Sequence, residues 1–295
     1  MTRDAEVLTA DAQPLSGKTI LITGATRGIG YAAAEALAGM GASVIVHGRN
    51  PARVEKACKR IARGVSGSEV SGVVADLDSL AQVRRLAREV TDSCPRLDVL
   101  LNNAGLVTRK RELTVDGFER QLAVNHLAPF LLTNLLLDKL KSSTPARIVN
   151  VSSRAHRRGG LDLDDLNWDK RPYTGISAYG ATKLANILFT RELARRLQGS
   201  GVTANCLHPG VVATSLFSGM GIVGRIFGIL SRPLLIPASR GAKTSVYLAS
   251  SPEVASVSGK YFDEAKPVEP KAPAMDDEAA KALWIASEKL TGLTA

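Results

Sequence analysis

A tyrosine and a lysine stand four residues apart in the segment Ser177–Lys183, which reads SAYGATK. If this segment is helical, Tyr179 and Lys183 lie on one face of the helix. An ammonium group beside a phenol stabilises the phenolate and lowers the phenol pKa, so the tyrosine can act as a general acid and base near neutral pH. Short motifs of this kind also arise by chance, and the pair therefore needs support from other residues.

Hydroxyl and amide side chains follow two predicted strands and interrupt one predicted helix. Ser152 and Ser153 end the run IVNVSS, and a hydroxyl there can donate a hydrogen bond to a carbonyl oxygen as charge develops on it. Serines also commonly end strands without that role. The sequence NNAG at Asn102–Gly105 ends a second strand. Asn125 lies inside a helix, where asparagine is a poor helix former, which indicates either a specific role or a core amide bonded to the backbone.

A glycine-rich turn, Thr23–Gly30 (TGATRGIG), joins the first predicted strand to the first predicted helix. Glycines let the chain turn tightly and bring backbone N–H groups against a pyrophosphate, whose charge the helix N-terminus favours. The GxxxGxG spacing departs from the GxGxxG form, and the alternative is a glycine turn that holds no ligand. The expected cofactor contacts in this turn are Gly24, Thr26, Arg27, Gly28, Ile29 and Gly30.

The position that selects between NAD and NADP lies about twenty residues after such a turn, where folds that prefer NAD carry an Asp or Glu. This chain has HGRN at His47–Asn50, without a carboxylate. Arg49, with Asn50 beside it, offers donors suited to a phosphate, and Arg27 supplies a second cation. We therefore expect NADP(H) to be preferred over NAD(H). The alternative is that Arg49 only begins the next helix.

The elements that position these residues alternate along the chain as short β-branched runs and longer segments of helical period. The runs are almost continuously apolar, as expected for a parallel sheet covered on both faces. The sequence predicts an α/β, doubly wound Rossmann fold, with helices on both faces of a mostly parallel seven-stranded sheet. Ligands of such folds bind at the carboxyl ends of the strands. The predicted strands are Lys18–Thr23, Ser43–His47, Val70–Ala75, Asp98–Asn102, Arg147–Val151, Val202–Leu207 and Gly259–Phe262. The predicted helices are Gly28–Met40, Pro51–Ile61, Ser79–Ser93, Phe118–Leu140 (broken up by Pro129), Ser177–Leu197 and Asp276–Leu290.

Length and composition fit one large domain over residues 15–295, after a flexible segment 1–14. Aromatic residues make up only 4% of the 295, so the core must consist mainly of Ala, Val, Ile and Leu. The net charge is +10, but the basic residues are scattered at helical spacing without interleaved aromatics, which argues against a nucleic-acid partner. Three widely spaced cysteines favour a reducing compartment, and we expect a cytoplasmic protein. No stretch reaches the about 18 apolar residues of a transmembrane helix.

The segment Thr214–Pro237 breaks the alternation, because it is rich in glycine and apolar residues and contains only two charged ones, Arg225 and Arg232. It follows the last central strand at the ligand edge. We interpret it, over about residues 213–238, as a lid on an apolar substrate. A packed helix and a peripheral membrane contact are the alternatives.

In their order along the chain, these motifs resemble the short-chain dehydrogenase/reductase family, over about Leu15–Phe262. The matching features are TGxxxGxG at Thr23–Gly30, NNAG at Asn102–Gly105, Asn125, Ser153, the pair Tyr179 and Lys183, and the turn Pro209–Gly210. The resemblance implies NAD(P)-dependent interconversion of a carbonyl and an alcohol.

The resemblance also implies a role for each matching residue. Tyr179 would transfer the proton, Lys183 would bind the nicotinamide ribose and lower the Tyr179 pKa, Ser153 would polarise the carbonyl, and Asn125 would hold a proton-relay water. No metal is expected, because this proton shuttle needs none. The further positions expected at the cofactor are Asp76 at the adenine, Leu77, Asn103, Ala104, Gly105 and Gly210 along the cofactor, and Pro209, Val212 and Thr214 at the nicotinamide.

One departure from most of the family is the length of Arg154–Ala178, the 25 residues between Ser153 and Tyr179. With the sequence LANILF at Leu184–Phe189, this insertion looks like the branch of retinol-dehydrogenase-like and WW-domain-oxidoreductase-like enzymes, which often handle lipophilic aldehydes, ketones or alcohols. Homo-oligomers are common in the family. We therefore expect an NADPH-dependent carbonyl reductase acting on a small lipophilic substrate. The alternative from another class is an NADPH-binding regulatory protein with little turnover.

Overall fold

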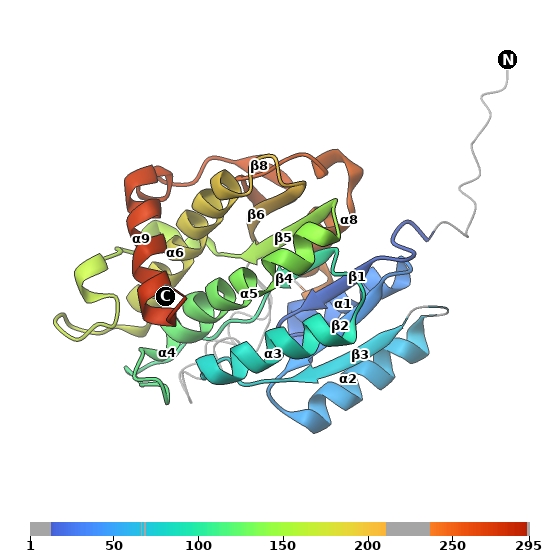
Figure 1. Cartoon of the computed structure of the whole chain (residues 1–295). Helices are drawn as coiled ribbons and strands as arrows, with labels where there is room; N and C mark the ends of the chain where they lie inside the picture. Colours follow the sequence, from blue (N-terminus) through green and yellow to red (C-terminus); the bar gives the residue numbers. More distant parts are fainter. Residues whose placement is uncertain (1–12, 66, 68, 211–236, 294–295) are drawn as a thin grey trace, which may run out of the picture.

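The computed structural model describes residues 13–65, 67, 69–210 and 237–293. Within them the chain forms one sheet in the order β3-β2-β1-β4-β5-β6-β7-β8, and every neighbouring pair is parallel except β7 and β8 (Figure 1). The predicted α/β Rossmann fold is confirmed. Nearly all of the predicted lid, 213–238, lies outside the described residues, as does most of the segment 1–14.

The strands are β1 (Thr19–Ile22), β2 (Ser43–Gly48), β3 (Val70–Val74), β4 (Val99–Asn102), β5 (Ala146–Val151), β6 (Val202–His208), β7 (Tyr261–Asp263) and β8 (Lys266–Val268). The helices are α1 (Gly28–Gly39), α2 (Pro51–Gly64), α3 (Leu80–Ser93), α4 (Arg120–Leu122), α5 (Ala128–Ser142), α6 (Gly175–Arg196), α8 (Ala238–Ser250) and α9 (Asp277–Thr291).

The sheet separates two layers of helices, because successive side chains of a strand point to opposite faces. On β1, Ile20 and Ile22 pack with residues of α1, α2 and α8 on one face. Leu21, between them, packs with residues of α3 and α5 on the other. All three side chains are fully buried, and each such burial contributes about 1.5–3 kcal/mol. The strands therefore need apolar residues at consecutive positions, which is the pattern in the sequence.

Among the described α-helices longer than one turn, four begin at a side chain that accepts a hydrogen bond from the first turn. These caps are Asn50 for α2, Ser79 for α3, Thr174 for α6 and Asp276 for α9. Such a cap typically contributes about 1 kcal/mol. The cap position of α1 is Arg27, whose side chain makes no capping bond. The N-terminus of α1 therefore differs from these four.

The long predicted helix Phe118–Leu140 is interrupted at another place than expected. The sequence analysis attributed the break to Pro129, but Pro129 lies in the first turn of α5, where its missing N–H is tolerated. The irregularity is a π-helical turn, η1 (Ala123–Leu127), that joins α4 to α5 and contains Asn125. Such turns often occur at functional sites.

The sheet has one strand more than predicted, because β7 and β8 form an antiparallel hairpin. Its two turn residues, Glu264 and Ala265, have φ angles of 50° and 60°. Turns of this kind normally carry Asn or Gly. This turn has neither residue, so no hairpin could be predicted there, and the prediction of seven strands was wrong.

The inserted segment between β5 and α6 is anchored by its two aromatic residues. Trp168 is buried against Ala178 of α6, and the guanidinium of Arg171 lies 3.8 Å from the centre of its ring. The Tyr173 hydroxyl accepts a hydrogen bond from Gln121 Nε2 at 2.7 Å and donates one to Glu119 at 2.9 Å. The insertion is therefore held to α4 and to the beginning of α6.

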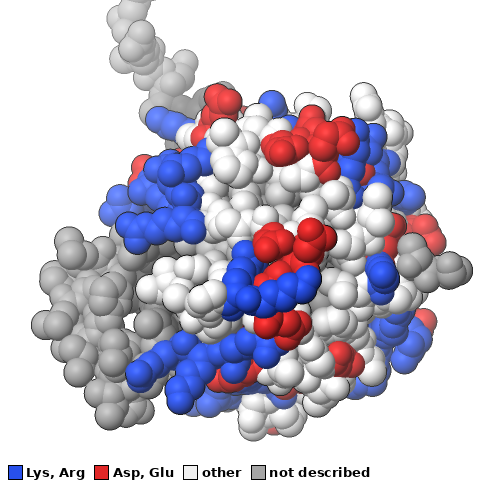
Figure 2. Space-filling view, turned by 90° about the vertical axis from the view of Figure 1, so that its left-hand side faces the viewer, with Lys and Arg blue, Asp and Glu red and all other residues white. Residues whose placement is uncertain are grey.

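Lys and Arg side chains are spread over the face shown in Figure 2, with Asp and Glu between them. Ion pairs among the described residues include Arg191 with Asp277, and Arg195 and Arg196 with Glu192. Within the described part of the chain, no helix combines the length and the apolar character needed to cross a bilayer.

The buried histidines predict loss of stability in mild acid. Burial lowers the pKa of His126 from 6.5 to about 4, so below pH 6.5 the unfolded chain takes up a proton that the folded chain refuses until about pH 4. For this residue we expect the free energy of unfolding to fall by about 2 kcal/mol between pH 7 and pH 5. Urea unfolding of the original protein and of His126→Phe at the two pH values measures this decrease. An equal decrease in both proteins would show that His126 does not cause it.

Candidate active site

The carboxyl ends of β1 and β4 are joined by the residues that follow them. The Asn103 side chain donates to the Thr23 carbonyl at 2.8 Å, and the Thr23 hydroxyl accepts from the backbone of Asn103 and Ala104 at 3.0 Å each. A Cβ atom on Gly24 would lie 3.0 Å from Ala104 Cα. The glycine turn and the NNAG segment thus form one rigid unit, as expected for two motifs that line the same ligand.

Three glycines of the turn are required by its geometry. Gly24 and Gly28 have φ angles of 66° and 60°, which other residues rarely adopt. A Cβ atom on Gly30 would lie 2.4 Å from Asn103 Nδ2 and 2.6 Å from the Gly24 carbonyl oxygen. Ile29 is half-buried against the neighbouring core. Because no side chain caps α1, the N-terminus of this helix is free to bind an anion.

His47 also supports the glycine turn, a role that the sequence analysis missed. Its Nδ1 accepts from the Gly24 backbone N–H at 3.3 Å, and its Nε2 donates to the Ala75 carbonyl at 3.0 Å. Burial lowers the pKa of His47 to about 4, so the ring is neutral and can make both bonds. No sequence motif marks this residue.

A group of three arginines lies beside the glycine turn. The pKa of Arg27 is lowered first by burial and then by the charges of Arg53 and Arg49, so each of these two arginines lies near enough to act on Arg27. Arg53 was not predicted. Arg49 is exposed, just ahead of α2, and Asn50 accepts from the Arg53 backbone N–H at 3.0 Å. The side-chain oxygen of Asn50, Oδ1, therefore caps α2, a structural use of a residue that was predicted at the cofactor.

Asp76 and Leu77 follow β3 and differ in exposure. Asp76 is half-buried, and one of its carboxylate oxygens accepts from the Asp78 backbone N–H at 3.1 Å. The Leu77 side chain is 6% exposed and belongs to the core beside Val83. Of these two predicted cofactor contacts, only Asp76 presents a partly accessible side chain.

Asn125 is fully buried, and its amide is occupied by protein groups. Its Oδ1 accepts from the Leu106 backbone N–H at 2.8 Å, and its Nδ2 donates to the Leu106 carbonyl at 3.0 Å and the Thr182 hydroxyl at 3.1 Å. The Asn125 side chain is thus bonded mainly to backbone groups, as in a core amide. This is the alternative to a specific role that the sequence left open. It ties the π-helical turn to α6 and to the segment after β4.

Lys183 is buried at the carboxyl end of β5. Its Nζ donates to the Val151 carbonyl at 2.9 Å, and burial lowers the Lys183 pKa to about 8, which leaves the group mostly charged at pH 7. A Cβ atom on Gly105 would lie 3.5 Å from Nζ and 3.4 Å from Asn125 Oδ1. Gly105, Asn125 and Lys183 therefore surround one point of the site, although they come from three segments.

Tyr179 is half-buried one turn before Lys183, and the Ser153 side chain lies near enough to act on its pKa. Burial raises the pKa of Tyr179 to about 12, and the Ser153 hydroxyl acts in the opposite direction. The sequence predicted a lowered pKa. The difference arises because Lys183 Nζ lies over the phenol ring, 5.5 Å from its centre, and donates to Val151 rather than to the phenolic oxygen.

The two serines after β5 have different surroundings. Ser152 is buried and donates to the Lys183 carbonyl at 2.7 Å, so its role is structural. Ser153 begins the 3-10 helix η2 (Arg154–Arg158), which crosses α6 where Gly159 meets Gly180. A Cβ atom on Gly159 would lie 2.2 Å from the Gly180 backbone. This close approach sets the spacing between Ser153 and Tyr179.

Pro209 and Gly210 follow β6 at the same edge of the sheet, and Gly210 has a φ angle of 85°. Val212 and Thr214 lie outside the described residues. The carboxyl edge thus brings together the predicted catalytic residues and most of the predicted cofactor residues.

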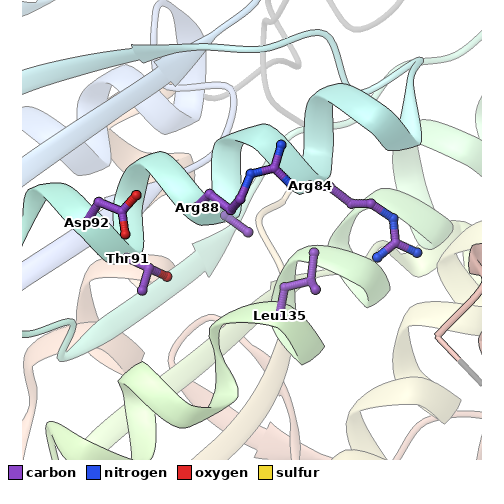
Figure 3. A pocket seen from close by; sticks show the side chains of 6 residues that line it. Arg84, Arg88, Thr91, Asp92 and Leu135 are labelled. Carbon is purple, nitrogen blue, oxygen red and sulfur yellow. The ribbon is translucent and has the colours of Figure 1, made fainter. Parts of the chain in front are cut away.

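A groove of about 280 Å³ lies elsewhere, between α3 and α5 (Figure 3). It is lined by Arg84, Arg88, Thr91, Asp92 and Leu135, with Ala87. Arg84 also donates to the carbonyls of Thr291 and Gly292 at the end of α9. None of the predicted site residues lines this groove, so it is separate from the candidate active site.

Known proteins resemble the chain over most of its length. Residues 18–221 match the family model for short chain dehydrogenases. Human retinol dehydrogenase 14 is 48% identical over 295 residues, an alignment that covers 95% of this chain and 88% of that protein.

Two solved structures are similar in fold. The crystal structure of an uncharacterized protein from Mycobacterium paratuberculosis has a TM-score of 0.77 and 38% identity, with 94% of each chain covered. A short chain dehydrogenase from Burkholderia cenocepacia J2315 in complex with NADP has a TM-score of 0.68 and 28% identity, with 84% of this chain and 96% of that chain covered.

The shared motifs, the confirmed Rossmann fold and these similarities agree with one another. The chain belongs to the short-chain dehydrogenase/reductase family of oxidoreductases, in its retinol-dehydrogenase-like branch.

Proposed function

We propose that the protein is an NADP(H)-dependent oxidoreductase that interconverts a lipophilic aldehyde or ketone and the corresponding alcohol. The observation that carries the proposal is that the Ser153 and Tyr179 side chains lie near each other at the carboxyl edge, with the Lys183 ammonium one helical turn away. The retention of this set argues against a regulatory protein that binds the cofactor without turnover.

The residues at the carboxyl edge fit a dinucleotide. The uncapped N-terminus of α1 favours a pyrophosphate, and Gly30 leaves space that a side chain would fill. Lys183 has three N–H donors, of which the described residues take one, at Val151. The others suit the hydroxyl groups of a ribose. When bound, the nicotinamide supplies or accepts the hydride.

In this mechanism the side chains of the chain handle the oxygen atom of the substrate. The Ser153 and Tyr179 hydroxyls donate hydrogen bonds to the carbonyl oxygen and so stabilise the negative charge that develops there. Tyr179 then gives its proton to this oxygen in reduction, and takes it back in oxidation. The positive charge of Lys183 favours the phenolate that remains, although burial alone raises the Tyr179 pKa.

The arginine group supports the preference for NADP(H). The charges of Arg49 and Arg53 repel that of Arg27 beside the glycine turn, and a phosphate of charge −1.5 to −2 would relieve this repulsion. The similar dehydrogenase from Burkholderia cenocepacia was solved with NADP.

Two observations support a lipophilic substrate. The similar human protein is named retinol dehydrogenase 14. Ile176, one helical turn before Tyr179 on α6, is 56% exposed. An exposed apolar side chain next to the reacting group suits an apolar substrate.

The catalytic assignment is tested with Tyr179→Phe. We expect turnover of NADPH with a panel of aliphatic, aromatic, steroid and retinoid carbonyls to fall by about 10²–10⁴-fold, because the general acid is lost. NADPH binding, followed by nicotinamide fluorescence, should change little. Tyr247→Phe is the matched control, since Tyr247 is bonded to Glu253 on an exposed surface. Unchanged turnover in Tyr179→Phe would refute the assignment.

The cofactor preference is tested with Arg49→Leu. Loss of a charge-assisted hydrogen bond to the phosphate should raise the KM for NADPH by about 10–100-fold and leave the KM for NADH nearly unchanged. The control is Arg63→Leu, an exposed arginine in the last turn of α2. Equal changes in the KM for NADPH and for NADH would show that Arg49 does not bind the phosphate.

The substrate class is tested with straight-chain aldehydes of increasing length. Each added methylene should raise kcat/KM by up to about fourfold until the apolar surface is covered. Ile176→Ser should reduce this dependence on length, whereas Ile285→Ser, on the exposed face of α9, should not. A kcat/KM independent of chain length would exclude a lipophilic substrate.

A further inference from the structure

The peptide group between Ser153 and Arg154 is held by two histidine rings. Its carbonyl oxygen, on Ser153, accepts from His156 Nδ1 at 2.7 Å and from the His156 backbone N–H at 3.1 Å. Its N–H, on Arg154, donates to His208 Nδ1 at 3.3 Å. Both polar atoms of one peptide group, directly after the proposed catalytic serine, are therefore bound by imidazoles.

The two rings must carry their protons on different nitrogens. The Ser153 carbonyl only accepts, so His156 Nδ1 carries a hydrogen, whereas the Arg154 N–H only donates, so His208 Nδ1 carries none. The two histidines are 2% and 4% exposed, and burial lowers the pKa of both. Neither Nε2 atom has a hydrogen-bond partner among the described residues. Nδ1 is thus the nitrogen that each ring uses.

These histidines reach the peptide group from separate elements. His156 lies in η2, and its ring packs edge-on against Tyr261 of β7, with ring centres 5.1 Å apart. His208 is the last residue of β6 and directly precedes Pro209. Rings fixed by two elements prevent the Ser153–Arg154 peptide from rotating. The Ser153 Oγ atom is further fixed by the Ala155 backbone N–H at 3.1 Å.

We propose that His156 and His208 are positioning residues that orient Ser153 toward Tyr179 and the substrate oxygen. The inference rests on the proposed function, because it assigns Ser153 to the carbonyl oxygen. Neither histidine touches the substrate in this scheme. Each histidine instead affects the reaction rate, because a displacement of a catalytic group by about 1 Å can lower the rate by about 10²-fold.

The kinetic test compares asparagine and leucine at each position. Asparagine places an amide atom near the site of Nδ1 and can replace the donor of His156 or the acceptor of His208. We expect His208→Leu and His156→Leu to lower kcat by about 10–100-fold, with the KM for NADPH changed less than about threefold. The asparagine variants should recover kcat to within about threefold of the original protein.

The matched control is Asn205→Leu. Asn205 is also a buried polar residue of β6, and it bonds to the backbone of Val257 at 2.6 Å and of Lys260 at 3.1 Å. Its replacement should lower the stability of the protein but leave the kcat of the folded enzyme unchanged. Equal kcat in the leucine and asparagine variants of a histidine would overturn the positioning role.

A second measurement does not depend on turnover. In long-range ¹H–¹⁵N spectra of the original protein at pH 7, His156 should be protonated on Nδ1 and His208 on Nε2. The same tautomer in both rings would overturn the proposal, even if a leucine variant fails to fold. If the expected tautomers are found but no carbonyl or alcohol is turned over, the arrangement of the histidines stands and the proposed function fails.

Discussion

The buried ammonium group of Lys183 is the charge around which the candidate site is built. A charge removed from water is costly unless protein groups bond to it. Here the Val151 carbonyl, at the end of β5, accepts from Nζ, and the Asn186 amide donates to the same carbonyl at 3.2 Å. Ser152 binds the Lys183 backbone in return. Helix α6 is therefore fixed to the end of β5, and Tyr179 and Ser153 are brought near each other as a consequence.

The close contacts around this charge depend on residues without side chains. Gly105 leaves room beside Lys183 Nζ, and Gly180 lies against Gly159 directly after Tyr179. Gly30 likewise allows close contact where α1 approaches Asn103. Because the interior is close-packed, a methyl group at Gly30 or Gly180 would move backbone rather than fill a void, whereas one at Gly105 would meet Lys183 Nζ at ordinary contact distance. The site is thus determined as much by the absence of side chains as by the catalytic groups.

Polar side chains at the carboxyl edge mainly orient backbone groups. His47 bonds to Gly24 and Ala75, Asn125 bonds to Leu106, and the Thr23 hydroxyl bonds to the segment after β4. Each bond satisfies a buried peptide group that lies beyond the regular hydrogen bonds of the sheet. They leave the Ser153 and Tyr179 hydroxyls, the arginines and the first turn of α1 to face a ligand. Rigid support of this kind keeps a few reactive groups in a fixed geometry.

The fold and most members of the site could be predicted from the sequence alone. Apolar runs, helix caps and glycine turns act locally, so their residue types identify β1, α2 or the turn at Thr23–Gly30 without knowledge of the remainder of the chain. The matching motifs likewise identified Ser153, Tyr179 and Lys183.

Only the tertiary structure decided how those residues are used. It placed the π-helical turn around Asn125, gave the Asn125 amide to Leu106, and made burial raise the Tyr179 pKa. It also revealed the β7–β8 hairpin and the supporting histidines, which no local pattern marks. The physical reason is that burial and hydrogen bonding are properties of contacts between distant segments. A residue type limits which bonds a side chain can make, and the packing of the segments selects among them.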